Sequence, residues 1–320
     1  MQAFELNEKW NSLYVGKAIK ILRIDSICRP DLFIGVDSEG QRCLTLKVSD
    51  IPDIYCEKSE LSNLSIEYFA QDKRIVIRVL NEYFWDLFND FIISIYNKIY
   101  DIVNVDEAVS EFLKTFNRWG DFFDDKKGTK LSEETIIGLF GELYLINYLL
   151  NQKDPHFSIS EIENSWVGPY DKGHDFEFPN IEYEVKTKSS RNLDVNIASE
   201  YQLQEELGKD LQLVVIDLDK DYIEGISIKK IIMLIKDKLL EVGGDFLFII
   251  DGLKQKNINF NDLEEYDNFR YKAEKIIFYD CLADGFPRLF RESLSPYIRK
   301  VRYQIRVSKL AEFIKLEKDL

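Results

Sequence analysis

Histidine and cysteine are scarce in this sequence of 320 residues. The only two histidines, His156 and His174, leave little material for a His-rich zinc site, a histidine general base or a Ser-His-Asp triad. The four cysteines have no CxxC spacing, which argues against a zinc ribbon or a disulfide framework and favours reduced thiols. We therefore expect the chemistry of the protein to depend on carboxylates and lysines.

Long apolar runs are absent as well. Stretches such as LQLVVIDL and DFLFIID have the length of buried strands and are too short to span a membrane. The N-terminal MQAFELNEKW lacks the basic-then-apolar pattern of a secretion signal. We expect a cytoplasmic protein with no membrane contact, and we find no internal repeat.

Positive charge is in deficit, with a formal net charge of -15. Such a chain does not hold nucleic acid by bulk electrostatics, because neutralising phosphates needs a concentrated basic surface. Residues 288–309 reverse the sign locally, since they carry seven lysines and arginines against one acid, Glu292. For any one of these residues a solvated surface position is the commoner explanation.

The length suits two domains, each with its own core. Residues 32–80 alternate as an antiparallel meander, and residues 81–103 and 105–123 have helical spacing. The polar stretch DDKKGTK, residues 124–130, is the best boundary. We predict an N-terminal domain, residues 1–127, of β-meander plus helices that could recognise DNA or a partner, and a second domain, residues 128–320.

The second domain alternates helices and strands. Ser132 is a plausible N-cap for a helix over residues 131–150. A hairpin with its turn at Pro179 and Asn180 follows. The later predicted elements are a strand 193–198, a helix 199–207 ended by Gly208, a strand 211–218, a helix 227–241, and strands 245–251, 276–280 and 301–307. The core order is α-β-β-β-α-β.

The strand IEYEVKTK carries the first candidate site. Its period of two places Glu184 and Lys186 on one face, and the turn folds Asp175 back toward Glu184. Two facing carboxylates repel each other unless a divalent cation lies between them. Asp175, Glu184 and the Val185 carbonyl would suit Mg²⁺, and Lys186 could orient a water or stabilise charge on a phosphate.

A further acid is available on the helix in GLFGEL, where Glu142 is the natural candidate. Gly138 and Gly141 beside it would allow the helix backbone to approach the sheet closely. In SWVGP we expect Trp166 to pack under the hairpin and the glycine and proline to form a turn. Taken alone, the Asp…Glu-x-Lys pattern is also typical of a solvated strand face, which is the more common structure.

A helix with a glutamate, a hairpin with the acids and the lysine, a third strand and a helix is the core order of the PD-(D/E)XK nucleases, and this sequence resembles that superfamily. It is most similar to the "putative PD-(D/E)XK family member" group, DUF4420, of bacterial proteins. The similarity rests on FNRWGDFF, GLFGEL, SWVGP, HDFEF, EYEVKTK and IASEYQL, and it covers most of the chain.

The resemblance implies a restriction-endonuclease-like α/β core, a mixed sheet flanked by helices, in residues 128–320. It makes Asp175, Glu184, Lys186 and Glu142 the catalytic residues, with Mg²⁺ as the metal and Mn²⁺ able to substitute. Ser199 and Gln202 would touch the site or the DNA backbone. Lys188 and Arg191 could contact phosphates, although surface positions explain them equally well. His174 stands where the superfamily has proline, and we expect a neighbour of the site since Mg²⁺ prefers oxygen.

The implied function is a Mg²⁺-dependent DNA endonuclease of a restriction or phage-defence system. A homodimer or a subunit of a multi-protein complex is expected, because cutting both strands needs two sites. The alternative is a non-catalytic DNA-binding or scaffolding subunit. A carboxylate-pair hydrolase acting on sugars is disfavoured, because a lysine beside one acid has a clear use at a phosphate and little at a glycosidic bond.

Overall fold

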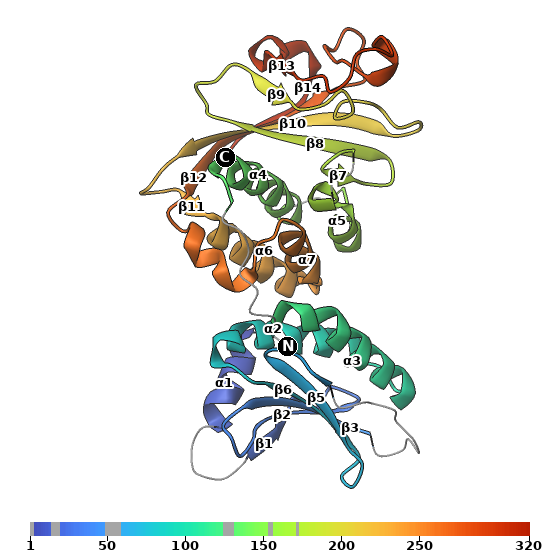
Figure 1. Cartoon of the computed structure of the whole chain (residues 1–320), viewed down its shortest axis with the longest axis vertical. Helices are drawn as coiled ribbons and strands as arrows, with labels where there is room; N and C mark the ends of the chain where they lie inside the picture. The colour runs from blue at the N-terminus through green and yellow to red at the C-terminus, as the bar shows by residue number, and fades with distance from the viewer. Residues whose placement is uncertain (1–2, 14–19, 49–58, 124–130, 153–155, 171–172) are drawn as a thin grey trace. The chain divides into compact units, whose positions relative to one another are not determined.

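The computed structural model describes residues 3–13, 20–48, 59–123, 131–152, 156–170 and 173–320 (Figure 1). The chain forms two compact units, residues 1–127 and 128–320. The stretch that we predicted as a boundary, residues 124–130, lies outside the described residues. Both units contain helices and sheets, so the predicted mixed α/β class is confirmed. In the described part of the chain no helix is long and apolar enough to cross a membrane.

The N-terminal unit contains an antiparallel sheet in the order β1-β2-β3-β6-β5-β4. Its strands are β1 Lys20–Arg23, β2 Asp31–Val36, β3 Arg42–Lys47, β4 Ser59–Glu60, β5 Leu64–Phe69 and β6 Arg74–Val79. The predicted strands are present, but the simple meander is wrong because β3 pairs with β6 and not with β5. The more completely buried β6 takes the central position, where Leu44 pairs with Ile77 and Leu46 with Ile75.

Helices accompany this sheet as the spacing predicted. They are α1 Ala3–Leu13, α2 Trp85–Ile99 and α3 Val105–Gly120. Phe88 and Phe91 of α2 pack against Phe123, and Phe91 also meets Trp119 of α3 edge-on. These aromatic contacts between α2 and the chain after α3 give the unit its own core.

The second unit is built on a mixed sheet in the order β11-β12-β10-β8-β7, with β14 paired to β12. The strands are β7 Phe176–Glu177, β8 Ile181–Lys188, β10 Asp210–Lys220, β11 Ile226–Ser227, β12 Arg270–Asp280 and β14 Ile314–Asp319. The central pair, β8 and β10, is parallel, and the other pairs are antiparallel. The predicted hairpin is confirmed, since Phe178 N–H donates to Ile181 O across the turn at 2.9 Å.

Different structures cover the two faces of this sheet (Figure 1). Helix α4, Glu133–Leu150, packs against Val185 and Thr187 on one face, and Ser132 caps it by accepting from Thr135 N–H at 3.2 Å. The opposite face, with Leu213 and Val215, packs against β9, Val195–Ile197, and β13, Tyr303–Ile305. The remaining helices of the unit are α5 Ile159–Ser165, α6 Ile228–Val242 and α7 Leu247–Gln255.

Four predicted elements differ in the structure. Residues 199–207 form turns, so the described chain has no helix between β9 and β10, and the core order α-β-β-β-α-β is wrong there. The Gln202 side chain accepts from Ala198 N–H at 2.6 Å, and such local bonds to the backbone compete with a helix.

The predicted strand 245–251 is mostly helix α7. Leu247, Ile250 and Leu253 are buried at helical spacing, an ambiguity that short apolar runs often carry. The predicted strands near 193–198 and 301–307 do not extend the main sheet, because β9 and β13 pair only with each other. They stack on the sheet through Val195, Ile197 and Ile305, which are buried against it.

The two glycines of α4 provide a matched test of helix-to-sheet packing. A Cβ at Gly141 would overlap Thr187 Cγ2, whereas a Cβ at Gly138 would meet nothing within 4 Å. Gly138→Ala should therefore raise the free energy of unfolding by up to about 1 kcal/mol through helix propensity. Gly141→Ala should be about 1–3 kcal/mol less stable than Gly138→Ala, since overpacking costs that much. Urea unfolding of both variants measures the difference, and equal stabilities would contradict the close packing.

Candidate active site at the edge of strand β8

The short strand β7 pairs only with the first part of β8. The site lies just before β7 begins, where the edge of β8 has no neighbouring strand. Asp175, just before β7, places its carboxylate there, and Val185 N–H donates to its Oδ2 at 2.8 Å. The carbonyl of Val185 faces the same edge, because the N–H and C=O of one strand residue point the same way. The aspartate thus takes the place of a partner strand and keeps its second oxygen at the edge.

Glu184 and Lys186 lie on β8 on either side of Val185. The Lys186 ammonium is 2.5 Å from Glu184 Oε1, and the Glu184 side chain is 1% exposed. Burial, followed by the charge of Asp175, raises the pKa of Glu184 to about 8. For Lys186 burial acts to lower the pKa, but Glu184 and Asp175 outweigh it and the pKa is raised, so the ammonium stays charged.

Glu142 reaches the same place from α4. The indole of Trp166 donates to its Oε2 at 2.7 Å. A Cβ at Gly168 would lie 2.8 Å from this oxygen and 2.9 Å from Asp175 Oδ1, so the two carboxylates converge on one glycine. Burial and then Asp175 raise the pKa of Glu142 to about 8. The predicted set Asp175, Glu184, Lys186 and Glu142 is brought together.

One residue next to the cluster was missed by the sequence argument. Lys256, at the end of α7, donates to Gly168 O at 3.2 Å, and its charge lowers the pKa values of Glu142 and Asp175. The pKa of Asp175 is nevertheless raised, because burial has the largest effect on it. The sequence LKQKN offers no pattern that distinguishes this lysine from a surface lysine, and the segment before it was assigned to a strand.

The oxygens of the site fit a hard divalent cation in chemical type. Asp175, Glu184 and Glu142 each use one oxygen for a partner within the chain. The second oxygen of each has no hydrogen-bond partner in the described structure. Carboxylate and carbonyl oxygens are the ligands that Mg²⁺ takes in proteins. Among the described residues, no group of three or more His, Cys, Asp or Glu side chains is arranged to hold a metal ion, so a cation at this site would have to complete its shell with water.

The other predicted contacts lie apart from this cluster. The Lys188 ammonium is paired with Asp217 of β10 at 2.5 Å, and its side chain is 9% exposed, which leaves it little freedom to reach DNA. Arg191 is exposed in the turn after β8. Ser199 is half-buried and accepts from Tyr201 N–H at 3.2 Å, and Gln202 bonds to Ala198 as described above. Both belong to a turn and not to the start of a helix.

His174 lies next to Asp175 but faces other groups. Its Nδ1 is 3.1 Å from Glu182 Oε2, and Lys209 holds the other oxygen of Glu182 at 3.0 Å. Burial lowers the pKa of His174 and raises that of Glu182. This buried group ties the start of β8 to the chain that enters β10, so it supports the strand that carries the site.

Comparison with protein families gives one match. The profile of the family described as "Putative PD-(D/E)XK family member" (DUF4420) matches residues 6–308. The chain belongs to this family. No curated protein and no solved structure matches it. Membership in this nuclease-like family agrees with the helix, hairpin and acid–lysine cluster described above, and the matched range includes both units.

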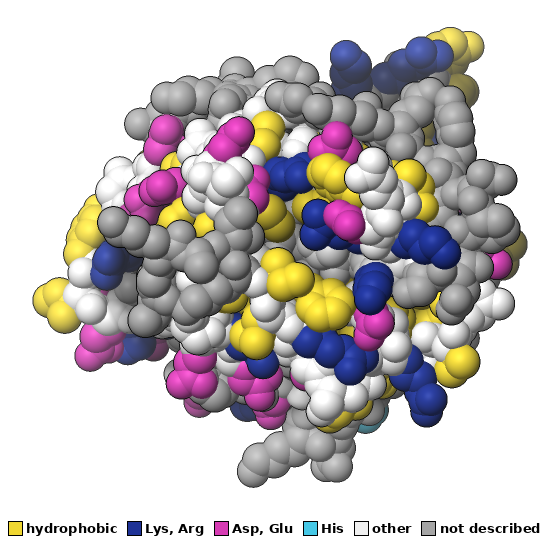
Figure 2. Space-filling view, turned by 90° about the horizontal axis from the view of Figure 1, so that it is seen from below, with side chains coloured by type: hydrophobic (Ala, Val, Ile, Leu, Met, Phe, Trp, Pro, Cys, Tyr) yellow, Lys and Arg dark blue, Asp and Glu magenta, His cyan; other side chains and the backbone are white. Residues whose placement is uncertain are grey.

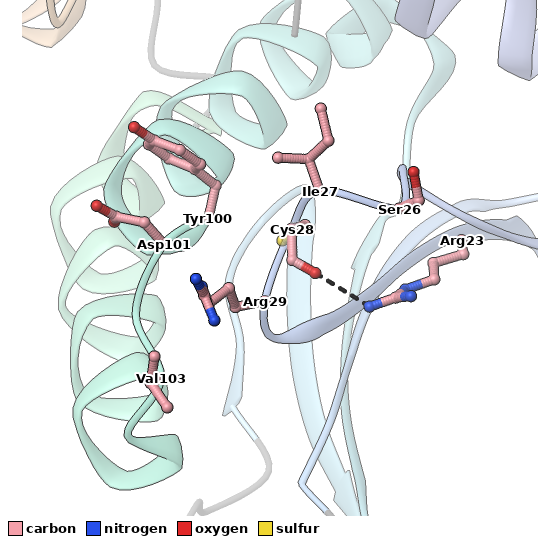
Figure 3. Close-up of a pocket in the computed structure, with 8 residues that line it drawn as sticks. All are labelled: Arg23, Ser26, Ile27, Cys28, Arg29, Tyr100, Asp101 and Val103. Carbon is pink, nitrogen blue, oxygen red and sulfur yellow. Dashed lines mark hydrogen bonds between the residues drawn. The ribbon is translucent and has the colours of Figure 1, made fainter.

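The N-terminal unit of this family member has a cavity of its own, about 590 Å³ in volume (Figure 3). Arg23 closes one side by donating to Cys28 O at 3.0 Å. Arg29 lies on the other side beside Tyr100 and Asp101. On the surface of Figure 2, lysine and arginine side chains are dispersed among hydrophobic and acidic ones. A recognition role for this unit stays a prediction.

The raised pKa of Glu184 predicts a pH dependence of stability in the presence of a chelator. The stabilisation from protonated Glu184 is fully present below the pKa of this group in the unfolded chain, near 4.5. It is lost as the pH rises through about 8. Glu184→Gln removes this titration, so the melting temperature of the variant should rise relative to that of the native protein between pH 5 and pH 8.5. Glu312→Gln, at an exposed acid, is the control. If the melting temperatures of Glu184→Gln and the native protein change in parallel with pH, ionisation of Glu184 does not destabilise the fold.

Proposed function

We propose that the protein is a Mg²⁺-dependent DNA endonuclease whose active site is formed by Asp175, Glu184, Lys186 and Glu142. The observation that carries this proposal is the convergence of three carboxylates and a charged lysine at the open edge of β8. Buried like charges are unfavourable by themselves, and a divalent cation makes their proximity favourable. The family membership supports the same chemistry.

Asp175, Glu184 and the Val185 carbonyl would hold the metal, with Glu142 close enough to bind directly or through a water. A bound Mg²⁺ supplies polarisation of the phosphate and a lower pKa of an attacking water. Lys186 keeps its proton on Nζ, so it serves as a cationic donor to a phosphate oxygen or a water and does not act as a general base. Trp166 fixes the Oε2 of Glu142 and thereby orients that carboxylate.

The biological setting comes from the family resemblance. We propose a restriction or phage-defence role in which Mn²⁺ can replace Mg²⁺, and in which a homodimer or a larger complex supplies the two sites needed to cut both strands. The alternative is a non-catalytic DNA-binding or scaffolding subunit. It is favoured by one observation, that Glu184 is already neutralised by Lys186 at 2.5 Å.

Purified protein with Mg²⁺ should cleave phage DNA. Single alanine substitutions in the proposed site test whether these residues carry the cleavage activity. Asp175→Ala and Lys186→Ala should each lower the cleavage rate by roughly 100-fold or more, because each removes a group that acts on the transition state. Circular dichroism should show that both variants are folded. Cleavage that survives both substitutions would mean that the site is assigned wrongly.

Calorimetric titration with Mg²⁺ distinguishes the nuclease from a scaffold. The native protein should bind the ion and Asp175→Ala should not, whereas a scaffold needs no such site.

Gly168 allows a test of the geometry that removes no charged group. Gly168→Ala should lower cleavage by on the order of 10- to 100-fold, since its Cβ would displace Glu142 and Asp175 and small misplacements are costly. Gly173→Ala is the matched control, because a Cβ there would meet nothing within 4 Å. Cleavage assays under single-turnover conditions compare the two. Equal rates would show that the convergence of the two carboxylates on Gly168 has no catalytic importance.

A further inference from the structure

The basic segment near the C-terminus divides into paired and unpaired charges in the structure. Arg288, Arg291 and Arg306 pair with acids of the turn after β9 or of the chain before it. The others include Arg299, Lys300 and Arg302, which are exposed and have no hydrogen bond or ion pair with any described residue. Three free cations therefore lie within four residues of each other on a protein of net charge -15.

These cations are on a loop, residues 294–302, that we call the basic loop. Arg291 donates to Ile298 O at 2.5 Å and to Ser295 O at 3.1 Å. Val301 N–H donates to Glu200 Oε2 at 3.0 Å, and Glu200 is 3% exposed. The backbone of the loop is thus held by the buried Glu200 and by Arg291, which lies just before the loop. A loop held in this way loses little conformational entropy when a ligand binds to its side chains.

The basic loop ends on the face of the sheet that carries Glu184 and Lys186. It leads directly into β13, which with β9 packs against Leu213 and Val215 (Figure 1). These two residues are the register partners of Glu184 and Lys186. Tyr303 is the first residue of β13. Burial raises the pKa of Tyr303 most, and the charge of Glu184 adds a small increase, so this tyrosine lies within electrostatic range of the site. The free cations therefore lie on the loop that leads into β13, and β13 packs on the sheet face that carries Glu184 and Lys186.

The chemistry of the loop suits a nucleic-acid backbone. Arginine and lysine bind phosphate oxygens by charge-assisted hydrogen bonds, and arginine can do so with two parallel bonds. Residues 293–303 contain no acid that would compete for them. Tyr297 is 95% exposed at the same loop and offers a ring on which a base can stack. A solvated surface charge would need neither the buried anchor nor the exposed aromatic ring.

We propose that Arg299, Lys300 and Arg302 form a phosphate-binding site that holds DNA at the active site on β8. This proposal rests on the proposed nuclease function for its choice of DNA as the partner. The loop supplies the local positive charge that an acidic chain otherwise lacks, and it acts in binding and not in the chemical step.

The test is the affinity of the full chain for a fluorescent DNA duplex in EDTA, where no cleavage occurs. The triple variant Arg299→Ala/Lys300→Ala/Arg302→Ala should bind roughly tenfold or more weakly at 100 mM salt. The slope of log affinity against log salt should become smaller by about 2.7, since each phosphate contact contributes about 0.9. Arg299→Lys/Arg302→Lys keeps the charge and should retain most of the affinity and the salt slope.

The control removes the same charge elsewhere. Lys229, Lys238 and Lys272 on α6 and β12 each pair with an acid, and changing all three to alanine should leave duplex affinity within about twofold, because none contacts the phosphates. An equal loss in this control would show a general charge effect and overturn the proposal, as would a native protein that does not bind the duplex. The melting temperature of both triple variants should match that of the native protein.

Cleavage in Mg²⁺ separates this proposal from the proposed function. If the native protein cuts DNA and the loop variant binds and cuts equally well, the nuclease stands and the basic loop is not its DNA contact. If neither protein cuts but the loop variant alone has lost binding, the loop is a DNA site and the nuclease function is wrong.

Discussion

The structure of the second unit depends on one unfavourable arrangement, the meeting of two buried carboxylates and one half-buried carboxylate at the edge of β8. Asp175, Glu184 and Glu142 repel one another, and burial raises the pKa of each. Proteins rarely bury acids unless these are paired or bind a metal. Here Lys186 and Lys256 compensate only part of the charge, because three carboxylates face two ammonium groups. The surrounding fold must therefore be stable enough to hold groups that would otherwise separate.

The elements around the site meet this requirement in specific ways. Strand β7 begins only at Phe176, so the preceding Asp175 can bind the backbone of Val185 by its side chain. Gly141 lets α4 lie against Thr187, and Gly168 leaves room for two carboxylate oxygens. When Glu142 is ionised, the hydrogen bond that Trp166 donates to its carboxylate is worth about 1.5–3 kcal/mol. Small residues and fixed donors occur where the charges meet.

The parts of this arrangement that the sequence predicts are those with local signals. The turn at Pro179 and Asn180 and the period of two place Glu184 and Lys186 correctly, and Ser132 caps α4 as its position before an apolar helix indicates. Lys256 could not be predicted, because it approaches Gly168 across 88 residues and its neighbours were assigned to a strand. The turn at residues 199–207 was missed for a similar reason. Glu200 is buried by a bond to Val301, and helix propensity contains no information about such distant partners.

Charge in this protein has opposite effects at long and short range. A net charge of -15 repels an approaching duplex, but salt screens charges beyond about 8 Å at physiological ionic strength. The contacts that we propose between phosphates and Arg299 or Arg302 would be shorter than this and would survive the screening in part. Because Glu142 and Glu184 are buried and Asp175 is half-buried, while the free cations of the basic loop are exposed, the surface that a duplex would meet there is more basic than the composition implies. Because the acids lie below the surface and the cations lie on it, the acids would be able to bind a metal cation without strongly repelling the phosphates of DNA.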